Sequence, residues 1–137
     1  MGVLSRLESI VAEMTSKLDA LSERGVRSWV EELAVLHALQ LQAQALLGML
    51  LRMAAGLGYA PESPGEAARI LREEGIIGGD EYLFIRRVIG FRNVVVHAYT
   101  EVNMELVRGI LEEREYRRLA VLAARLLGEA SKRGLDP

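Results

Sequence analysis

The residues with the clearest chemical potential lie at positions 91–99, where polar side chains interrupt an apolar run rich in valine. Arg92, Asn93, His97 and Tyr99 are the polar residues of this segment, and His97 is one of only two histidines in the chain. Histidine suits proton transfer, because its pKa lies near neutral pH. Arginine suits a phosphate group, because its planar guanidinium keeps its charge and offers paired donors. The segment could therefore supply both proton transfer and phosphate binding.

Helical geometry divides these four side chains between two directions. With Arg92 at the origin, a helix of roughly 100° per residue places Asn93 at about 100°, His97 at about 140° and Tyr99 at about −20°. Asn93 and His97 are one turn apart, so the amide could orient the imidazole. Arg92 and His97 could meet only through the length of the arginine or across a symmetry axis. A single histidine in an apolar helix is more often structural than catalytic, and this alternative stays open.

The pattern Phe91-Arg92-Asn93, three apolar residues, His97, one residue and Tyr99 resembles the signature of the HEPN superfamily in its HepT-like form. That form has an arginine, four residues, a histidine, one residue and a tyrosine. The resemblance extends back over residues 61–77, which read as a proline-bounded loop, a short helix and a Glu-Gly-Ile-Ile exit.

The resemblance implies a metal-independent endoribonuclease that leaves a cyclic phosphate, with Arg92 and His97 as catalytic residues and no cofactor. It also implies a homodimer whose two motifs face one another across a cleft. HepT-like proteins are toxins neutralised by a small nucleotidyltransferase, the MntA-like antitoxin. That antitoxin would transfer AMP groups to Tyr99, where added phosphates beside Arg92 would block the site for RNA.

The apolar periodicity predicts an all-α chain without strands, and the resemblance implies a HEPN-type bundle. We expect one HepT-like domain over residues 1–137, with about four long helices plus one short helix arranged up and down. Ser63-Pro64-Gly65-Glu66 predicts the start of the short helix, because serine caps, proline fits the first position and glutamate reaches back. The expected helices run from the N-terminus to near 25, from about 26 to 57, from 64 to about 74, from 80 to the motif, and from 103 to about 130.

The helix that carries the motif has two apolar stripes. One stripe suits the core of the domain and consists of Phe84, Val88, Phe91 and Val95. The second consists of Ile85, Ile89 and Val96. Because a helix that is apolar on two sides is buried on two sides, we expect a second copy to cover this second stripe. Gly90 would permit close approach of that copy.

The remaining polar features have simpler expectations. His37 is interpreted as a structural or surface residue, because no motif surrounds it. The alternating Gln40, Gln42 and Gln44 are expected to face solvent. The charged run at 112–118 is expected to be the solvated face of one continuous fifth helix.

Composition limits the classes of function that fit. Lys and Arg number 17 against 19 Asp and Glu, so a generally basic nucleic-acid binder is disfavoured, and any RNA contact needs a local patch. There is no cysteine, and two distant histidines do not suggest a metal site. The apolar run from Ala45 to Leu51 is too short for a membrane span, which needs about 20 residues. Without a visible secretory signal, a cytoplasmic protein is expected.

Three functions remain open at the level of sequence. The favoured one is a ribonuclease toxin. The second is a non-catalytic helical subunit that binds a nucleotidyltransferase and presents its substrate. The third is a helical dimer in which Arg92 and His97 only hydrogen-bond across the interface.

Overall fold

The structure is a computed structural model that describes residues 2–97 and 103–135, except for the side chains of residues 96 and 97. All regular secondary structure in these two ranges is helical, which confirms the predicted all-α class. The elements in chain order are α1 (Val3–Arg24), α2 (Trp29–Gly56), α3 (Pro64–Glu73), α4 (Gly79–His97), α5 (Met104–Glu113) and α6 (Arg117–Lys132).

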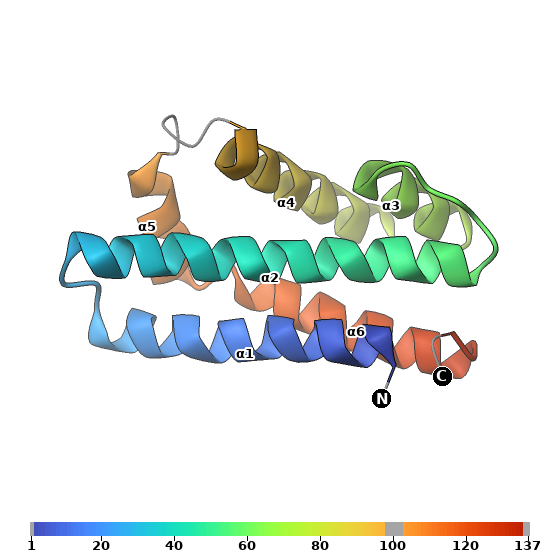
Figure 1. The fold of residues 1–137 in the computed structure, drawn as a ribbon, viewed down its shortest axis with the longest axis horizontal. Helices are drawn as coiled ribbons and strands as arrows, with labels where there is room; N and C mark the ends of the chain where they lie inside the picture. Colours follow the sequence, from blue (N-terminus) through green and yellow to red (C-terminus); the bar gives the residue numbers. More distant parts are fainter. Residues whose placement is uncertain (1, 98–102, 136–137) are drawn as a thin grey trace.

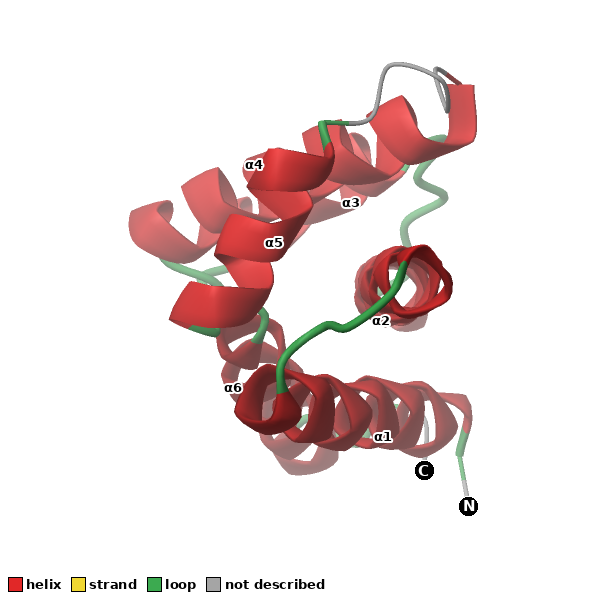
Figure 2. Ribbon diagram, turned by 90° about the vertical axis from the view of Figure 1, so that its left-hand side faces the viewer, coloured by secondary structure: helices red, strands yellow, loops and turns green. Residues whose placement is uncertain are grey.

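The longest helix, α2, is the centre of the bundle and contacts every other helix. Figure 1 shows α1 and α2 side by side and antiparallel, with α6 running behind them. α3 and α4 lie on the other side of α2 from α1, and α5 closes one end (Figures 1 and 2). The arrangement places α4, which carries the motif, on the outside of the bundle.

Polar caps fix where several helices begin. The hydroxyl of Ser63 accepts from the backbone N–H of Glu66, whose carboxylate accepts in return from the N–H of Glu62. The serine cap confirms the predicted start of the short helix, although the glutamate reaches back to the residue before the cap and not to Ser63 itself. Asn103 caps α5 by accepting from the N–H groups of Glu105 and Leu106. Such caps satisfy donors that have no partner within the first helical turn.

The prediction of a single fifth helix is wrong, because the chain turns between Glu113 and Arg117 and forms two helices. Arg114 ends α5 in the left-handed conformation, with φ of 58°. The turn lets Tyr116 enter the core, where its side chain is only 1% exposed. Most charged residues of the run are exposed, as expected, but the run does not form one continuous helical face, because Tyr116 is buried at the turn.

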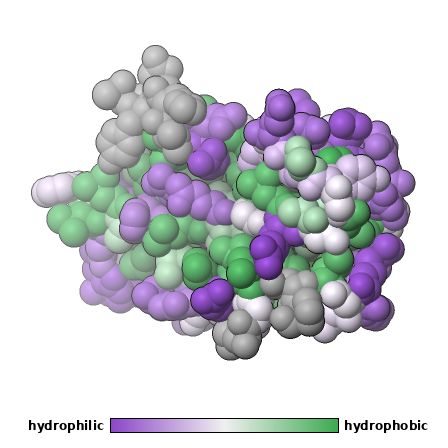
Figure 3. All heavy atoms as spheres, turned by 45° about the vertical axis from the view of Figure 1, so that its right-hand side comes forward, coloured by the Kyte–Doolittle hydropathy of each residue, from purple (hydrophilic) through white to green (hydrophobic). Residues whose placement is uncertain are grey.

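The expectation that Gln42 faces solvent is also wrong, because its side chain is 0% exposed. It lies on α2 among core residues that include Ala43, Leu46 and Leu50. α2 is long and apolar enough to cross a membrane, but 61% of its apolar 18-residue window is buried inside the protein, as in a core helix. Some large apolar side chains stay at the surface, and Figure 3 shows one face where green apolar patches lie among purple hydrophilic groups.

Candidate functional site

The predicted site residues lie at the C-terminal end of α4 and just beyond it. Arg92 is partly exposed and Asn93 is exposed. The backbone of His97 forms the last residue of α4, while its side chain lies outside the described part of the structure. Tyr99 also lies outside the described residues. The structure thus places Arg92, Asn93 and the backbone of His97 on one rigid helix.

Apolar contacts hold this end of α4 in position. Val95 is 3% exposed and belongs to a cluster with Leu36 and Leu39 of α2 and Val107 and Leu111 of α5. A β-branched side chain buried from two directions fixes both the position and the rotation of its helix. Because Arg92 and Asn93 belong to the same helix, its rotation also sets the directions of their side chains. The apolar residues of the motif therefore orient the site.

The second apolar stripe of α4 is packed inside this protein, which corrects part of the predicted dimer interface. Ile85 is 0% exposed and belongs to the main core, so it has no surface to offer a second copy. Ile89 is partly buried and packs against the same core, and the side chain of Val96 is not described. The physical reason is that α4 lies against both α2 and α3, so Ile85 and Ile89 pack against the core of the same chain.

The exposed side of α4 is a different one. Leu83 is 62% exposed and Val94 is 44% exposed. Between them along the helix lie Arg87 and Gly90, which are exposed as well. A Cβ added at Gly90 would meet nothing within 4 Å. We call the side formed by Leu83, Arg87, Gly90 and Val94 the outer face of α4; its residues recur at the helical spacing of three or four.

Positive charge gathers along α4 without carboxylate partners. No ion pair between described residues includes Arg86, Arg87 or Arg92, whereas Arg69, Arg117 and Arg125 each pair with a carboxylate. Arg86 donates only to the hydroxyl of Tyr82, at 3.5 Å. Cations left without internal partners can bind phosphate groups. The same described ranges hold no group of three His, Cys, Asp or Glu side chains that could bind a metal ion.

A second polar cluster, between α1 and α6, was not predicted from the sequence. The hydroxyl of Tyr116 donates to Asp19, which also accepts from Arg117 Nε at 2.8 Å. These bonds, that of Arg117 first, hold the pKa of Asp19 below its usual value. Burial, together with the bond to Asp19, raises the pKa of Tyr116 to about 12. Residues 97 positions apart form this cluster, so no local pattern could have revealed it.

The chain matches the family model "Ribonuclease HepT-like" over residues 3–131. A chain of a crystal structure described as a toxin–antitoxin with AMP-PNP shares the fold, with a TM-score of 0.76 over 88% of this chain and 97% of that chain, at 13% sequence identity. Among curated protein sequences, none matches. The match covers nearly the whole chain and includes the motif at the end of α4. This protein therefore belongs to the HepT-like ribonuclease family of the HEPN superfamily.

Proposed function

We propose that this protein is a metal-independent endoribonuclease toxin of a toxin–antitoxin pair that acts in the cytoplasm. The observation that carries the proposal is the placement of Arg92 and His97 at the end of one well-anchored helix, within the region that matches the HepT-like family. The unpaired arginines of α4 support it, because they give a slightly acidic chain a local surface for RNA phosphates.

The proposed reaction is cleavage of RNA by its own 2′-hydroxyl. A histidine takes the proton of that hydroxyl, its oxygen forms a bond to the adjacent phosphorus, and the bond from phosphorus to the 5′-oxygen breaks. The leaving oxygen takes a proton from an imidazolium, and the products are a 2′,3′-cyclic phosphate and a 5′-hydroxyl. Arg92 would hold the phosphate with its paired donors as negative charge grows. Asn93 would orient His97 from one turn away.

The reaction needs both an acid and a base, which supports a homodimer that brings two copies of His97 to one phosphate. The outer face of α4 offers the surface for this dimer in place of the buried Ile85. Apolar Leu83 and Val94 would provide contact area, and Gly90 would let two helices approach closely.

The proposed antitoxin is an MntA-like minimal nucleotidyltransferase that binds this protein and adds AMP to Tyr99. A toxin–antitoxin structure with the same fold supports a partner of this kind. Each AMP carries a negative phosphate to the neighbourhood of Arg92, where it would compete with the phosphate of RNA. The modification would therefore switch off cleavage without unfolding the toxin.

The test is digestion of a defined RNA in excess chelator by wild type and single variants. We expect His97→Ala to reduce the cleavage rate by about 1,000-fold, since proton transfer contributes factors of about 100 to 10,000. His37→Ala is the matched control, because His37 is the other histidine and is exposed on α2. Arg92→Lys should lose about 100-fold, because lysine keeps the charge but not the paired donors.

The products should end in a cyclic phosphate, detected by resistance to 3′-end labelling until acid treatment opens the ring and a phosphatase removes the resulting monophosphate. Equal cleavage by wild type and His97→Ala would contradict the proposal and favour the non-catalytic subunit. Loss of cleavage in chelator that returns with a divalent ion would contradict metal independence alone.

A further inference from the structure

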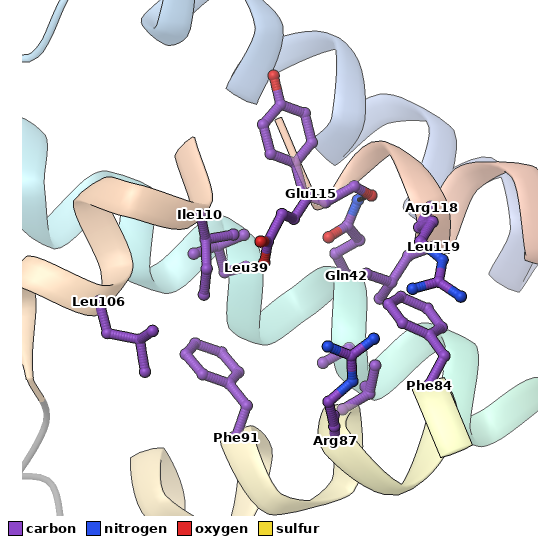
Figure 4. A pocket seen from close by; sticks show the side chains of 13 residues that line it. Leu39, Gln42, Phe84, Arg87, Phe91, Leu106, Ile110, Glu115, Arg118 and Leu119 are labelled. Carbon is purple, nitrogen blue, oxygen red and sulfur yellow. Dashed lines mark hydrogen bonds between the residues drawn. The ribbon is translucent and has the colours of Figure 1, made fainter. Parts of the chain in front are cut away.

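A pocket of about 340 Å³ opens between α4 and the junction of α5 and α6, with α2 as its floor. Its walls are largely apolar and include Leu39 of α2, Phe84 and Phe91 of α4 and Ile110 of α5. Figure 4 shows these side chains pointing into one space from separate helices. The volume lies at the lower end of the range for ligand sites, about 300–1,000 Å³, so it suits one small planar group.

The floor of the pocket holds a buried acceptor with no partner. Gln42 is 0% exposed, and its Oε1 atom makes no hydrogen bond with any described group. Its Nε2 atom donates to Thr15 Oγ1 at 2.8 Å and to the carbonyl of Tyr116 at 3.0 Å. Because a carbonyl can only accept, the amide cannot be turned over, and the free atom must be the oxygen. Figure 4 shows that oxygen on the side toward Glu115, within the space that the lining residues border.

An unpaired buried oxygen is costly, since an unmet hydrogen bond in the interior costs about 1–3 kcal/mol. Native proteins leave few such groups, and each calls for an explanation such as an ordered water, an ion or a functional role. The oxygen of Gln42 can accept from an N–H or O–H donor of a bound group. The apolar walls and the two phenylalanine rings favour a donor that belongs to a flat, largely apolar ring.

The rim of the pocket is cationic. Arg118 lies over the ring of Phe84 at 4.4 Å from its centroid, and Arg87 lies over the same ring at 5.8 Å. Neither guanidinium forms an ion pair within the described ranges. Both also line a second, open depression next to the pocket, together with Arg86, Leu83 and one carboxylate, that of Asp80. An anionic group at this rim would meet three arginines.

We propose that this pocket binds one nucleotide unit whose base carries an exocyclic amino group. The base enters between Phe84 and Phe91, and its amino group donates to Gln42 Oε1. The phosphate rests on Arg87 and Arg118. Glu115, which lines the pocket near Gln42, accepts from the hydroxyls of the ribose. Amino-bearing bases are favoured because they present a donor where the floor offers only an acceptor.

The nucleotide has two sources with the same chemistry: a free nucleotide or one residue of an RNA strand. The second source rests on the proposed function, because the pocket would then hold a nucleotide of the bound RNA away from the scissile phosphate. The first does not. Binding is therefore measured without cleavage, in the His97→Ala background, so that failure of the ribonuclease proposal and failure of this one are separate results.

The experiment is isothermal titration of this protein with three probes: AMP, adenosine, and the 5′-monophosphate of purine riboside, which is AMP without its amino group. We expect the purine riboside monophosphate to bind about tenfold more weakly than AMP, the effect of one lost hydrogen bond of about 1.4 kcal/mol. Adenosine should also bind about tenfold more weakly, because it lacks the phosphate. No binding of AMP at millimolar concentration, or equal binding of all three probes, would overturn the proposal.

Two sets of variants assign the contacts. Gln42→Leu should abolish the difference between AMP and purine riboside monophosphate, whereas Gln44→Leu, on the exposed side of the same helix, should keep it. The double change Arg87→Gln with Arg118→Gln should abolish the difference between AMP and adenosine, and Arg6→Gln, an exposed arginine of α1, should not. If Gln42→Leu fails to fold, the three-probe comparison on the unchanged chain still decides.

Competition by a six-residue oligoadenylate separates the two sources. Displacement of AMP by the oligonucleotide at equal nucleotide concentration supports an RNA-bound residue. Binding of AMP that the oligonucleotide leaves unchanged supports a free nucleotide. A difference between the three probes that persists in Gln42→Leu would place the donor contact elsewhere and would contradict this pocket as the site.

Discussion

Arg92 combines a backbone position on the buried side of α4 with a side chain that stays partly exposed. Viewed down the helix axis, Arg92 points in a direction between those of Val88 and Ile85, which lie one and two turns earlier and are buried in the core. An arginine can bury its hydrocarbon stem and still present its guanidinium to water. The Cα of this residue is held by the core while its guanidinium can reach solvent, which suits a group that must hold a phosphate as its charge grows.

Tyr99 gives a prediction at this scale, because its hydroxyl is the proposed AMP acceptor. After co-expression with an MntA-like nucleotidyltransferase, we expect intact-mass spectrometry to show added AMP on wild type and none on Tyr99→Phe. The variant should keep its cleavage of RNA, because phenylalanine preserves the ring and removes only the acceptor oxygen. Tyr116→Phe serves as the control, since its hydroxyl is buried against Asp19 and should not affect modification.

Unmodified Tyr99 in the presence of an active nucleotidyltransferase would contradict regulation by AMP. Antitoxin that still stops cleavage under those conditions would indicate inhibition by binding alone.

At the scale of elements, α4 is buried on two sides by its own chain and exposes one outer face. The exposed glycine at its centre carries a cost, because glycine within a helix costs about 1 kcal/mol relative to alanine. Gly90 has open space around it, so nothing inside this chain requires a glycine there. A second helix that packs closely against this position would explain the glycine, because a larger side chain would keep the two helices apart.

This leads to a prediction about oligomeric state. Gly90→Gln should convert the proposed dimer to a monomer, measured by light scattering after size exclusion, because the new side chain would hold the two helices apart. Its melting temperature should not fall through effects within the protomer, since glutamine is a good helix former and meets no neighbour.

Gly128→Gln is the matched control, because Gly128 is an exposed glycine of α6 with nothing within 4 Å of an added Cβ. It should leave the mass of the assembly unchanged. A dimer that survives Gly90→Gln would move the interface away from the outer face of α4.

At the scale of the whole molecule, a polar cluster joins the first helix to the last. Asp19 of α1 accepts from the hydroxyl of Tyr116 and from Arg117 of α6, and Arg114 donates to Ser22 nearby. Hydrogen bonds to a charged group are stronger than neutral ones, at about 1.5–3 kcal/mol. The cluster therefore fixes how α6 lies against α1, and with it the position of the first turn of α6, which carries Arg118 at the pocket.

The cluster predicts how stability depends on pH. The pKa of Asp19 is lowered in the folded state, so its contribution is present above the usual value of 3.8 and is lost as pH falls through the lowered value. The pKa of Tyr116 is raised from 10.0 to about 12, so its contribution is present below pH 10 and is lost as pH rises through about 12.

Asp19→Asn should therefore lower the free energy of unfolding by about 1 kcal/mol at pH 7, measured by urea denaturation. The difference from wild type should shrink below the usual pKa of a carboxyl group. Glu13→Gln is the control on the same helix, because its ion pair with Lys17 is exposed and should contribute at most about 0.5 kcal/mol. An Asp19→Asn deficit that is constant down to pH 2 would contradict the lowered pKa.

The sequence by itself determined the all-α class, the start of α3 and the helix that carries Arg92, Asn93 and His97. Each of these depends on residues within about one or two helical turns: apolar spacing, a serine followed by proline and glutamate, and the motif itself. Because these features depend only on residues that are close in sequence, they can be predicted without knowledge of the tertiary structure.

Only the tertiary structure decided which side of each helix is inside. Ile85 and Ile89 lie on a stripe that could face a partner or the core, and the packing of α4 against both α2 and α3 settled the choice. Gln42 is polar in every local pattern, yet the carbonyl of Tyr116, 74 positions away, holds it inside. Burial depends on which distant surfaces meet, and the apolar periodicity of one helix does not contain that information.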